Sequence, residues 1–422
     1  MEKKDILSFS KNVITLFTGS FFAQVISFCT LIVLQRFFYS PEDYAPFRLF
    51  FEFTAVFSSI SALRLESGLI LERDDNNAIQ LLRTCLKICI IISIVGGIIF
   101  LGYFLNELAI FENNLILIIL MPIAIFSNGI IQIAQSFFTR NKKFKTISKT
   151  KIIHSFFGST SQIATGYSGW SFIGLIIGRI IGLISANVNY VYAFFKHNKW
   201  NRNNSSLEKE LLKKHRNFIW YTTPGIFLGN AINLLILMFF ARYYGEEFTG
   251  LTAAAIQYLG LIIMLFTSSF AQVYYNEIAQ IEEIKTIKSV HTFWLIRLLA
   301  VTTIGWIILI FIPNNWVTFI LGEEWKQLME IIKIISPWMA TMFIASSLSF
   351  IFIRLGKQKH IFFFDLFHVI LIISSILAGH LIFQNNYTTL YIVTSSQVLF
   401  YIMAILLAYY FLNTSIKKQL QR

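Results

Sequence analysis

Charged residues are scarce in this sequence, and their scarcity excludes most soluble architectures. Only 14% of the 422 residues are Asp, Glu, Lys or Arg, whereas 56% are hydrophobic and the mean hydropathy is +0.65. A soluble globular domain usually carries about 25% charged residues. The composition is therefore that of a membrane protein, and it leaves no room for a sizeable soluble domain.

Residues that signal metal binding or catalysis are also few. The three cysteines are Cys29, Cys85 and Cys89, and the last two are spaced i,i+4 without the pattern of a metal site. No Gly-Lys-Ser/Thr phosphate loop occurs. The longest loop expected on the outer side, residues 313–326, has Glu323 and Glu324 as its only acids and contains no histidine. We expect no cofactor, and a transporter rather than an enzyme.

The formal net charge of +13 does not indicate nucleic-acid binding. The basic residues lie in short clusters between apolar stretches and form no extended stripe. Membrane topology explains such clusters better, and nucleic acid is not an expected partner.

Apolar stretches of about 20 residues, enough to cross a bilayer, occur in two sets of six. The first set covers residues 13–34, 44–63, 86–105, 115–138, 152–167 and 172–195, and the second covers 218–240, 251–274, 292–312, 331–353, 361–383 and 390–411. The first stretch is longer than a signal-peptide core and lacks a small-residue cleavage site, so we expect it to remain as a span.

Alternate loops differ in basic content, which predicts the orientation by the positive-inside rule. The opposite side offers only Arg36, Arg242 and Lys326. Both termini are therefore predicted to be cytoplasmic. Basic residues that support this orientation on the predicted cytoplasmic side include Arg140, Lys142, Lys143, Lys145, Lys149, Lys151, Lys196, Lys199, Arg202, Lys209, Lys213, Lys214, Arg216, Arg354, Lys357, Lys359, Lys417, Lys418 and Arg422.

The most charged loop divides the chain into a first lobe at residues 1–196, a cytoplasmic linker at 197–216 and a second lobe at 217–422. A short internal repeat aligns residues 36–39 with 242–245, where each lobe leaves its first span. Six spans per lobe make the repeats parallel. We predict an all-α polytopic membrane protein with about 12 transmembrane helices in two parallel six-helix lobes around a central cavity, a geometry suited to alternating access.

The segment Ser40-Pro41-Glu42-Asp43 predicts the start of the second span, with a serine N-cap followed by proline. Arg48 and Glu52 then lie about 10 Å and about 16 Å along the helix. Their i,i+4 spacing places them on one face, and charge facing lipid is costly. Two readings stay open: a pair that neutralises itself within the bundle, or a cavity-facing pair that binds an anionic head group.

Other charged residues lie nearer the interfaces. Arg64, Glu66 and Arg297 are expected close to the cytoplasmic ends of their helices, where either snorkelling or substrate binding accounts for them. Arg179 lies near mid-span, and we expect it to bind backbone carbonyls. Its neighbours Gly174, Gly178 and Gly182 have the small-xxx-small spacing of close helix packing.

Two further groups of polar residues are candidates for proton transfer or sugar binding. Asp365 and His368, spaced i,i+3 on the eleventh span, form a possible proton relay near an interface. The uncharged set either hydrogen-bonds sugar hydroxyls or joins helices. It consists of Gln24, Asn230, Asn233 and Gln257.

Several segments resemble the polysaccharide exporters related to O-antigen (Wzx-type) flippases, within the multidrug/oligosaccharidyl-lipid/polysaccharide exporter superfamily. The resemblance lies in residues 38–44, in 64–71, in 140–145, in 174–178 and in 244–245. It covers most of the first half and the start of the second.

This resemblance implies two six-helix lobes and a cationic cavity that flips undecaprenyl-pyrophosphate-linked oligosaccharide, of O-antigen or capsule type, across the bacterial inner membrane. It makes Arg48, Arg64 and Arg297 candidates for the pyrophosphate, because guanidinium groups donate bidentate hydrogen bonds. The seventh and eighth spans contribute few charges, which departs from the family pattern. Membrane lipids, the lipid-linked oligosaccharide, and the polysaccharide polymerase and chain-length machinery are the implied partners, with H⁺ or Na⁺ as the coupling ion.

Three alternatives stay open at this point. The chain could be a drug/sodium antiporter of the same superfamily, a membrane-embedded glycan polymerase or acyltransferase, or a structural membrane partner. Acid/base or nucleophilic groups in an accessible site would favour an enzyme.

Overall fold

Each of the twelve expected spans lies wholly or mostly on one long helix, although the second extends past its helix end at Ser59 and the tenth crosses a break after Ser347 into a short helix. The computed structural model describes residues 3–195 and 205–420, and those residues form helices and no strand. Ten helical stretches of the described chain are long and apolar enough to cross a membrane. The two long helices outside that group are α2, which contains four charged residues, and α6, which begins with a lysine-rich turn.

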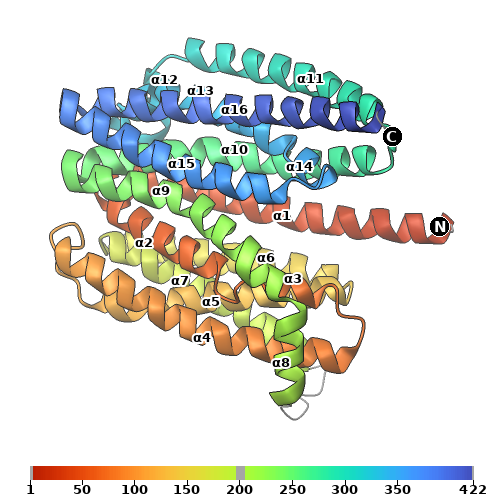
Figure 1. Ribbon diagram of the computed structural model, residues 1–422. Helices are drawn as coiled ribbons and strands as arrows, with labels where there is room; N and C mark the ends of the chain where they lie inside the picture. The colour runs from red at the N-terminus through yellow and green to blue at the C-terminus, as the bar shows by residue number, and fades with distance from the viewer. Residues whose placement is uncertain (1–2, 196–204, 421–422) are drawn as a thin grey trace. The chain divides into compact units, whose positions relative to one another are not determined.

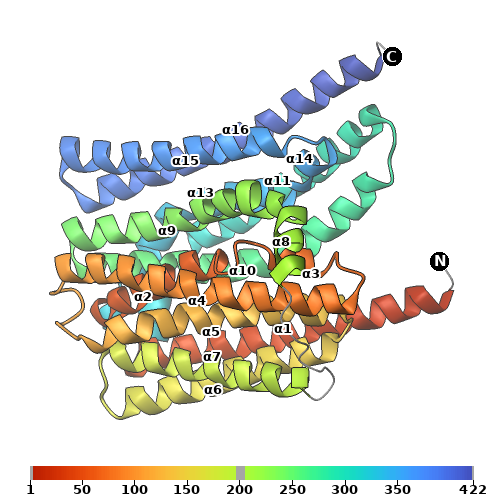
Figure 2. The same cartoon turned by 60° about the horizontal axis from the view of Figure 1, so that its bottom comes forward.

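The chain separates into two compact units, Met1–Leu234 and Leu235–Arg422. The long helices of the first unit run alongside one another (Figures 1 and 2). Its elements are α1 (Lys3–Phe37), α2 (Pro41–Ser59), α3 (Glu66–Leu69), α4 (Asp75–Asn106), α5 (Ile116–Arg140), α6 (Phe144–Tyr167), α7 (Phe172–Phe195), α8 (Ser205–Lys214), the π-helix η1 (Phe218–Thr222) and the start of α9 (Thr223–Tyr244).

The second unit begins within α9, at Leu235, and contains the remaining helices. Its core joins α10, α11, α14 and α16 around Tyr274, Ile287 and Phe411. The elements are α10 (Glu246–Ala279), α11 (Ile284–Phe311), α12 (Asn315–Leu321), the short η2 (Glu323–Trp325), α13 (Leu328–Ser347), α14 (Phe350–Arg354), α15 (Gln358–Ala378), the π-helix η3 (Gly379–Phe383) and α16 (Asn386–Leu420).

The predicted linker is only partly described. Residues 196–204, with Lys196, Lys199 and Arg202, lie outside the described chain, and the following residues form α8. Leu211 of α8 is buried in a cluster with Leu81 and Phe137 of the first unit. The lobe boundaries at 196 and 217 stay a prediction.

The glycines of α7 pack against α6, as their spacing predicted. A Cβ atom added to Gly178 would lie 2.7 Å from the backbone nitrogen of Gln162, and one added to Gly182 would lie 2.8 Å from the carbonyl oxygen of His154. Gln162 also donates a hydrogen bond to the Leu175 carbonyl at 3.0 Å. Only glycine permits this separation.

The predicted repeat is visible where each first helix ends. α1 ends at Phe37 and α9 at Tyr244, next to the aligned arginines. Phe38 then packs on Gly166 at the end of α6, and the Tyr244 hydroxyl contacts the Thr389 hydroxyl of α16 at 2.7 Å. In both halves, the exit of the first helix thus packs near the junction between the fifth and sixth helices.

Candidate functional site

The start of α2 fixes the depth of its charged residues. The Ser40 hydroxyl accepts a hydrogen bond from the Asp43 amide at 3.2 Å, and the Asp43 carboxylate accepts one from the Ser40 amide at 3.1 Å. This capping box confirms the predicted helix start. Arg48 and Glu52 consequently lie two to three turns inside the helix.

Arg48 and Glu52 form an ion pair within α2. Arg48 is 7% exposed and Glu52 is 6% exposed, and a hydrogen bond joins Nη2 of Arg48 to Oε1 of Glu52. The Arg48 guanidinium also lies over the ring of Phe51, 5.0 Å from its centroid. Each charge therefore has the partner that a buried ion requires.

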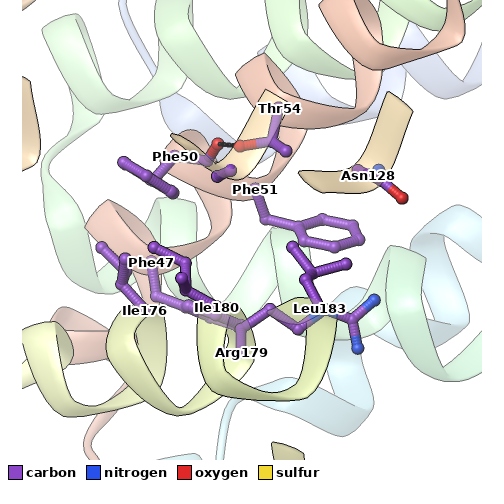
Figure 3. Close-up of a pocket in the computed structure, with 10 residues that line it drawn as sticks. Phe47, Phe50, Phe51, Thr54, Asn128, Ile176, Arg179, Ile180 and Leu183 are labelled. Carbon is purple, nitrogen blue, oxygen red and sulfur yellow. Dashed lines mark hydrogen bonds between the residues drawn. The ribbon is translucent and has the colours of Figure 1, made fainter. Parts of the chain in front are cut away.

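A second guanidinium shares the same aromatic ring. Arg179, from α7, lies 5.1 Å from the centroid of Phe51, and Figure 3 shows it reaching toward that ring from below. Two arginines and one carboxylate leave a net positive charge around Phe51, and the cation–π contacts stabilise both guanidinium groups.

The expectation that Arg179 binds backbone carbonyls is wrong. In the described chain no carbonyl accepts a hydrogen bond from it. Gly178 packs against α6, and the next residue, Arg179, lies over the Phe51 ring of α2 instead. Its hydrogen-bond donors therefore remain available to a ligand.

Arg179 and Phe51 line a pocket between α2, α5 and α7 (Figure 3). The pocket is narrow: the figure of about 330 Å³ for its space includes the open surroundings, and only about 20 Å³ can hold the centre of a water molecule. Asn128 supplies an amide, and most of the wall is aliphatic or aromatic. The remaining lining residues are Phe47, Phe50, Thr54, Ala124, Ile176, Ile180 and Leu183.

Arg64 and Glu66 lie away from this pocket, because α2 ends at Ser59 and the chain turns before it reaches them. Arg64 has a positive φ of 57° and forms an ion pair of 3.2 Å with Glu66. It also donates to the Ser67 hydroxyl at 3.5 Å. The structure thus places this pair in a turn between α2 and α3, and its role in substrate binding stays a prediction.

The other predicted residues are scattered over several helices. Gln24 of α1 is half-buried, and its side-chain oxygen has no hydrogen-bond partner in the described chain. Asn230 is exposed and donates to the Ile226 carbonyl of its own helix at 2.8 Å. Asn233 and Gln257 are half-buried on α9 and α10. Their cavity role stays a prediction.

Arg297 of α11 is exposed. Its guanidinium lies 3.2 Å from the ring centroid of Phe293 and 5.7 Å from that of Trp294. Such stacking is what snorkelling toward an interface predicts, although no ligand contact tests its role in binding pyrophosphate.

Asp365 and His368 are not joined by a hydrogen bond in the described chain. His368 instead contacts the side-chain oxygen of Gln397 at 2.9 Å and stacks on the Phe400 ring at 3.5 Å. The relay therefore stays a prediction.

Sequence reasoning missed a buried polar cluster at the end of the first unit. The Glu72 carboxylate is 2% exposed and accepts hydrogen bonds from Lys214 at 2.6 Å and His215 at 2.7 Å. Burial by itself raises the pKa of Glu72, but the hydrogen bonds from these two bases outweigh it and leave the pKa below its ordinary value. The cluster fastens α8 across the end of α4.

Comparison with solved structures shows the fold class of the protein. The fold is similar to that of "Lipid II flippase MurJ, inward closed conformation", with a TM-score of 0.66, 15% identity, and coverage of 96% of this chain and 87% of that one. A multidrug-resistance MATE transporter of the MOP superfamily, in its inward-facing conformation, gives a TM-score of 0.62 at 13% identity, with coverages of 96% and 95%. The fold is that of this class of multi-pass membrane transporters.

A third structure of this class is a MOP superfamily transporter from Pyrococcus furiosus, described as having a binding pocket of reverse polarity. It gives a TM-score of 0.65 at 12% identity and covers 96% of both chains. The profile of the family described as polysaccharide biosynthesis protein matches residues 33–330, so the chain belongs to that family. A search of curated proteins gives no sequence match.

Proposed function

We propose that this protein is a flippase that translocates a polyprenyl-diphosphate-linked oligosaccharide, such as an O-antigen or capsule repeat unit, by alternating access. Membership of the polysaccharide biosynthesis family supports a glycan substrate. The likeness to a lipid II flippase supports a lipid-linked form of that substrate. In this proposal the membrane is the bacterial inner membrane, and both termini are cytoplasmic, as the basic loops predict.

The observation that carries the proposal is the pocket beside Arg179. Its guanidinium has no acceptor among the described residues and lies beside the already paired Arg48. A diphosphate offers several oxygens at the spacing of a guanidinium fork. The side-chain nitrogen of Asn128 donates one hydrogen bond to the Ser58 hydroxyl at 2.9 Å and has a second N–H for a neighbouring oxygen, and the apolar wall suits the first isoprenoid units.

A reconstituted flipping assay tests this function. Purified protein in liposomes would receive a fluorescent polyprenyl-diphosphate oligosaccharide, and a membrane-impermeant quencher would report how much label crosses the bilayer. We expect protein-dependent flipping, and a loss of about tenfold or more in Arg179→Gln, because one charge-assisted contact is worth about 1.5 kcal/mol or more.

Arg73→Gln is the matched control, because it removes an exposed arginine that lies outside the pocket. It should flip within about twofold of the wild type, as expected of a surface substitution. Saturable efflux of a cationic drug with no flipping of the lipid would favour the drug/sodium antiporter instead. Equal activity in the two arginine variants would remove the pocket from the proposal.

A further inference from the structure

One turn recurs in the two units with the same backbone conformation. It follows α5 at Arg140-Asn141-Lys142-Lys143 and follows α14 at Arg354-Leu355-Gly356-Lys357. Its third residue has a positive φ in both copies, 53° at Lys142 and 65° at Gly356.

The hydrogen bonds of the two copies correspond pair by pair. Lys143 N–H donates to the Phe138 carbonyl at 2.9 Å, and Lys357 N–H donates to the Phe352 carbonyl at 2.8 Å. Lys142 donates to Thr139 and Gly356 to Ile353, each at 3.0 Å. This is a Schellman motif that ends α5 in the first unit and the short helix α14, directly after α13, in the second.

The arginine that opens each turn also makes equivalent contacts. In the first unit, Nε of Arg140 donates to the Glu72 carbonyl at 2.7 Å and Nη2 donates to the Arg73 carbonyl at 2.9 Å. In the second unit, Nε of Arg354 donates to the Ile278 carbonyl at 3.1 Å and Nη2 donates to the Ile281 carbonyl at 2.6 Å. The same two nitrogens thus hold the segment that leads from the second long helix to the third.

The backbone carbonyls that these two arginines contact need a hydrogen-bond donor from outside their own segment. Ile278 lies in the last turn of α10, and Glu72 lies in the segment between α3 and α4, so neither carbonyl has a following helical turn to satisfy it. The planar guanidinium of arginine donates hydrogen bonds to two carbonyls at once in fixed directions, whereas the ammonium of lysine is a compact charge without this fork. The arrangement therefore requires arginine rather than any basic residue.

We infer that Arg140 and Arg354 are equivalent positioning residues that hold the end of the fourth long helix of each half, α5 or α13 with α14, to the connection between the second and third long helices while the protein works. In the first unit, this clamp joins α5, which bears Asn128, to residues 72–73 at the entry to α4, at the far end of the connection from α2. The inference rests on the proposed flippase function. It contrasts with the view that these arginines serve only as positive charges that orient the chain.

Arginine-to-lysine substitutions separate the two views, because they keep the charge and remove the fork. In Arg140→Lys and in Arg354→Lys we expect flipping to fall about tenfold, the effect of losing one hydrogen bond to a charged group. Membrane orientation, measured by labelling of terminal cysteines, should be unchanged. The matched controls are Lys142→Gln and Lys359→Gln, which remove an exposed charge but keep each clamp, and both should flip as the wild type does.

A cross-link between the two segments that Arg140 joins distinguishes a positioning role from a general loss of stability. Cysteines at positions 73 and 141, in a Cys29→Ser background because Cys29 is the exposed native thiol, would be joined by a short thiol-reactive cross-linker. In Arg140→Lys this cross-link should restore flipping to within about threefold of the wild type, because it replaces the hydrogen bond that was lost. A cross-link that leaves the lysine variant inactive would overturn the positioning role.

Amide hydrogen exchange keeps the inference testable even if the protein flips no lipid. Arg140→Lys should raise exchange at residues 74–78, and Arg354→Lys should raise it at residues 282–287, about tenfold in each case. Failed flipping with these exchange changes would reject the proposed function and keep the clamp. Unchanged exchange and wild-type flipping in both lysine variants would reject the clamp.

Discussion

The two halves share a helical scaffold but differ in where they place charge. α2 has Arg48 and Glu52 buried along its length, whereas its counterpart α10 has its acidic residues close to its ends. α6 begins with lysines and does not meet the criterion for an apolar span, whereas its counterpart α15 does. The repeated arginine turn is common to both. The two halves thus share one arrangement of helices. The first half carries charged residues within these helices, whereas the corresponding helices of the second half are largely apolar.

The fifth and sixth helices show the same contrast in packing. α6 and α7 approach through glycines, whereas α15 and α16 meet through the stacked rings of His368 and Phe400. The backbone separation in the first half leaves no space for a side chain. Arg179 directly follows Gly178 of this contact, so the pocket lies beside it.

Breaking the buried ion pair should give the largest effect. Arg48→Ala leaves Glu52 buried without its partner, which should lower the free energy of unfolding by about 3–5 kcal/mol. Arg297→Ala, at an exposed position of the second half, should change it by less than about 0.5 kcal/mol. Thermal unfolding of the purified variants measures both.

A double variant separates the stabilising role of that pair from its function. Arg48→Met with Glu52→Leu removes both charges and should recover most of the lost stability, since buried pairs are often replaceable by apolar residues. We expect this variant to fold but not to flip lipid-linked glycan. Equal thermal stability of the Arg48→Ala and Arg297→Ala proteins would mean that the two halves do not differ as argued here.

A single methyl group tests the packing contrast. Gly178→Ala would place its Cβ 2.7 Å from a backbone nitrogen of α6, and such overpacking should cost about 1–3 kcal/mol. A Cβ on Gly305, in α11 of the second half, would meet nothing within 4 Å. Gly305→Ala should therefore stabilise the protein by about 0.5–1 kcal/mol. A loss of stability in both variants would contradict the contrast.

Much of this architecture follows from the sequence. The apolar runs gave the long helices, and the serine and proline before α2 predicted its start, because both signals are local. The partner of Arg179 was not predictable, since it depends on the rotation of α7 against α6 and on the position of Phe51 on another helix. In the sequence, Arg140 and Arg354 are positive charges that predict orientation, and Arg140 also belongs to a segment that resembles the exporter family. Their role depends on a turn with positive φ, and in one copy that residue is a lysine, which gives no turn signal.

Substitutions that loosen helix α8 should have the smallest effect. They test whether α8, which follows α7 in the chain, is packed as part of the first half. Glu72→Gln removes the carboxylate shared by Lys214 and His215, and amide exchange in α8 should rise about fivefold, because Lys214 is largely exposed and its contribution is screened. Glu210→Gln removes an exposed carboxylate of the same helix and serves as the control, with little change expected.

The pH dependence of this docking has a definite sign. Because the pKa of Glu72 is lowered in the folded protein, its carboxylate contributes full stability above the ordinary value of 4.5. That contribution is lost only as the pH falls below 4.5 through the lowered pKa. The protection of α8 amides, which is the exchange rate corrected for its intrinsic pH dependence, should therefore stay high from neutral pH down to about 5. It should fall at lower pH in the wild type, but not in Glu72→Gln, whose side chain does not titrate. An equal fall in protection in both proteins would mean that other carboxyl groups hold α8 in place.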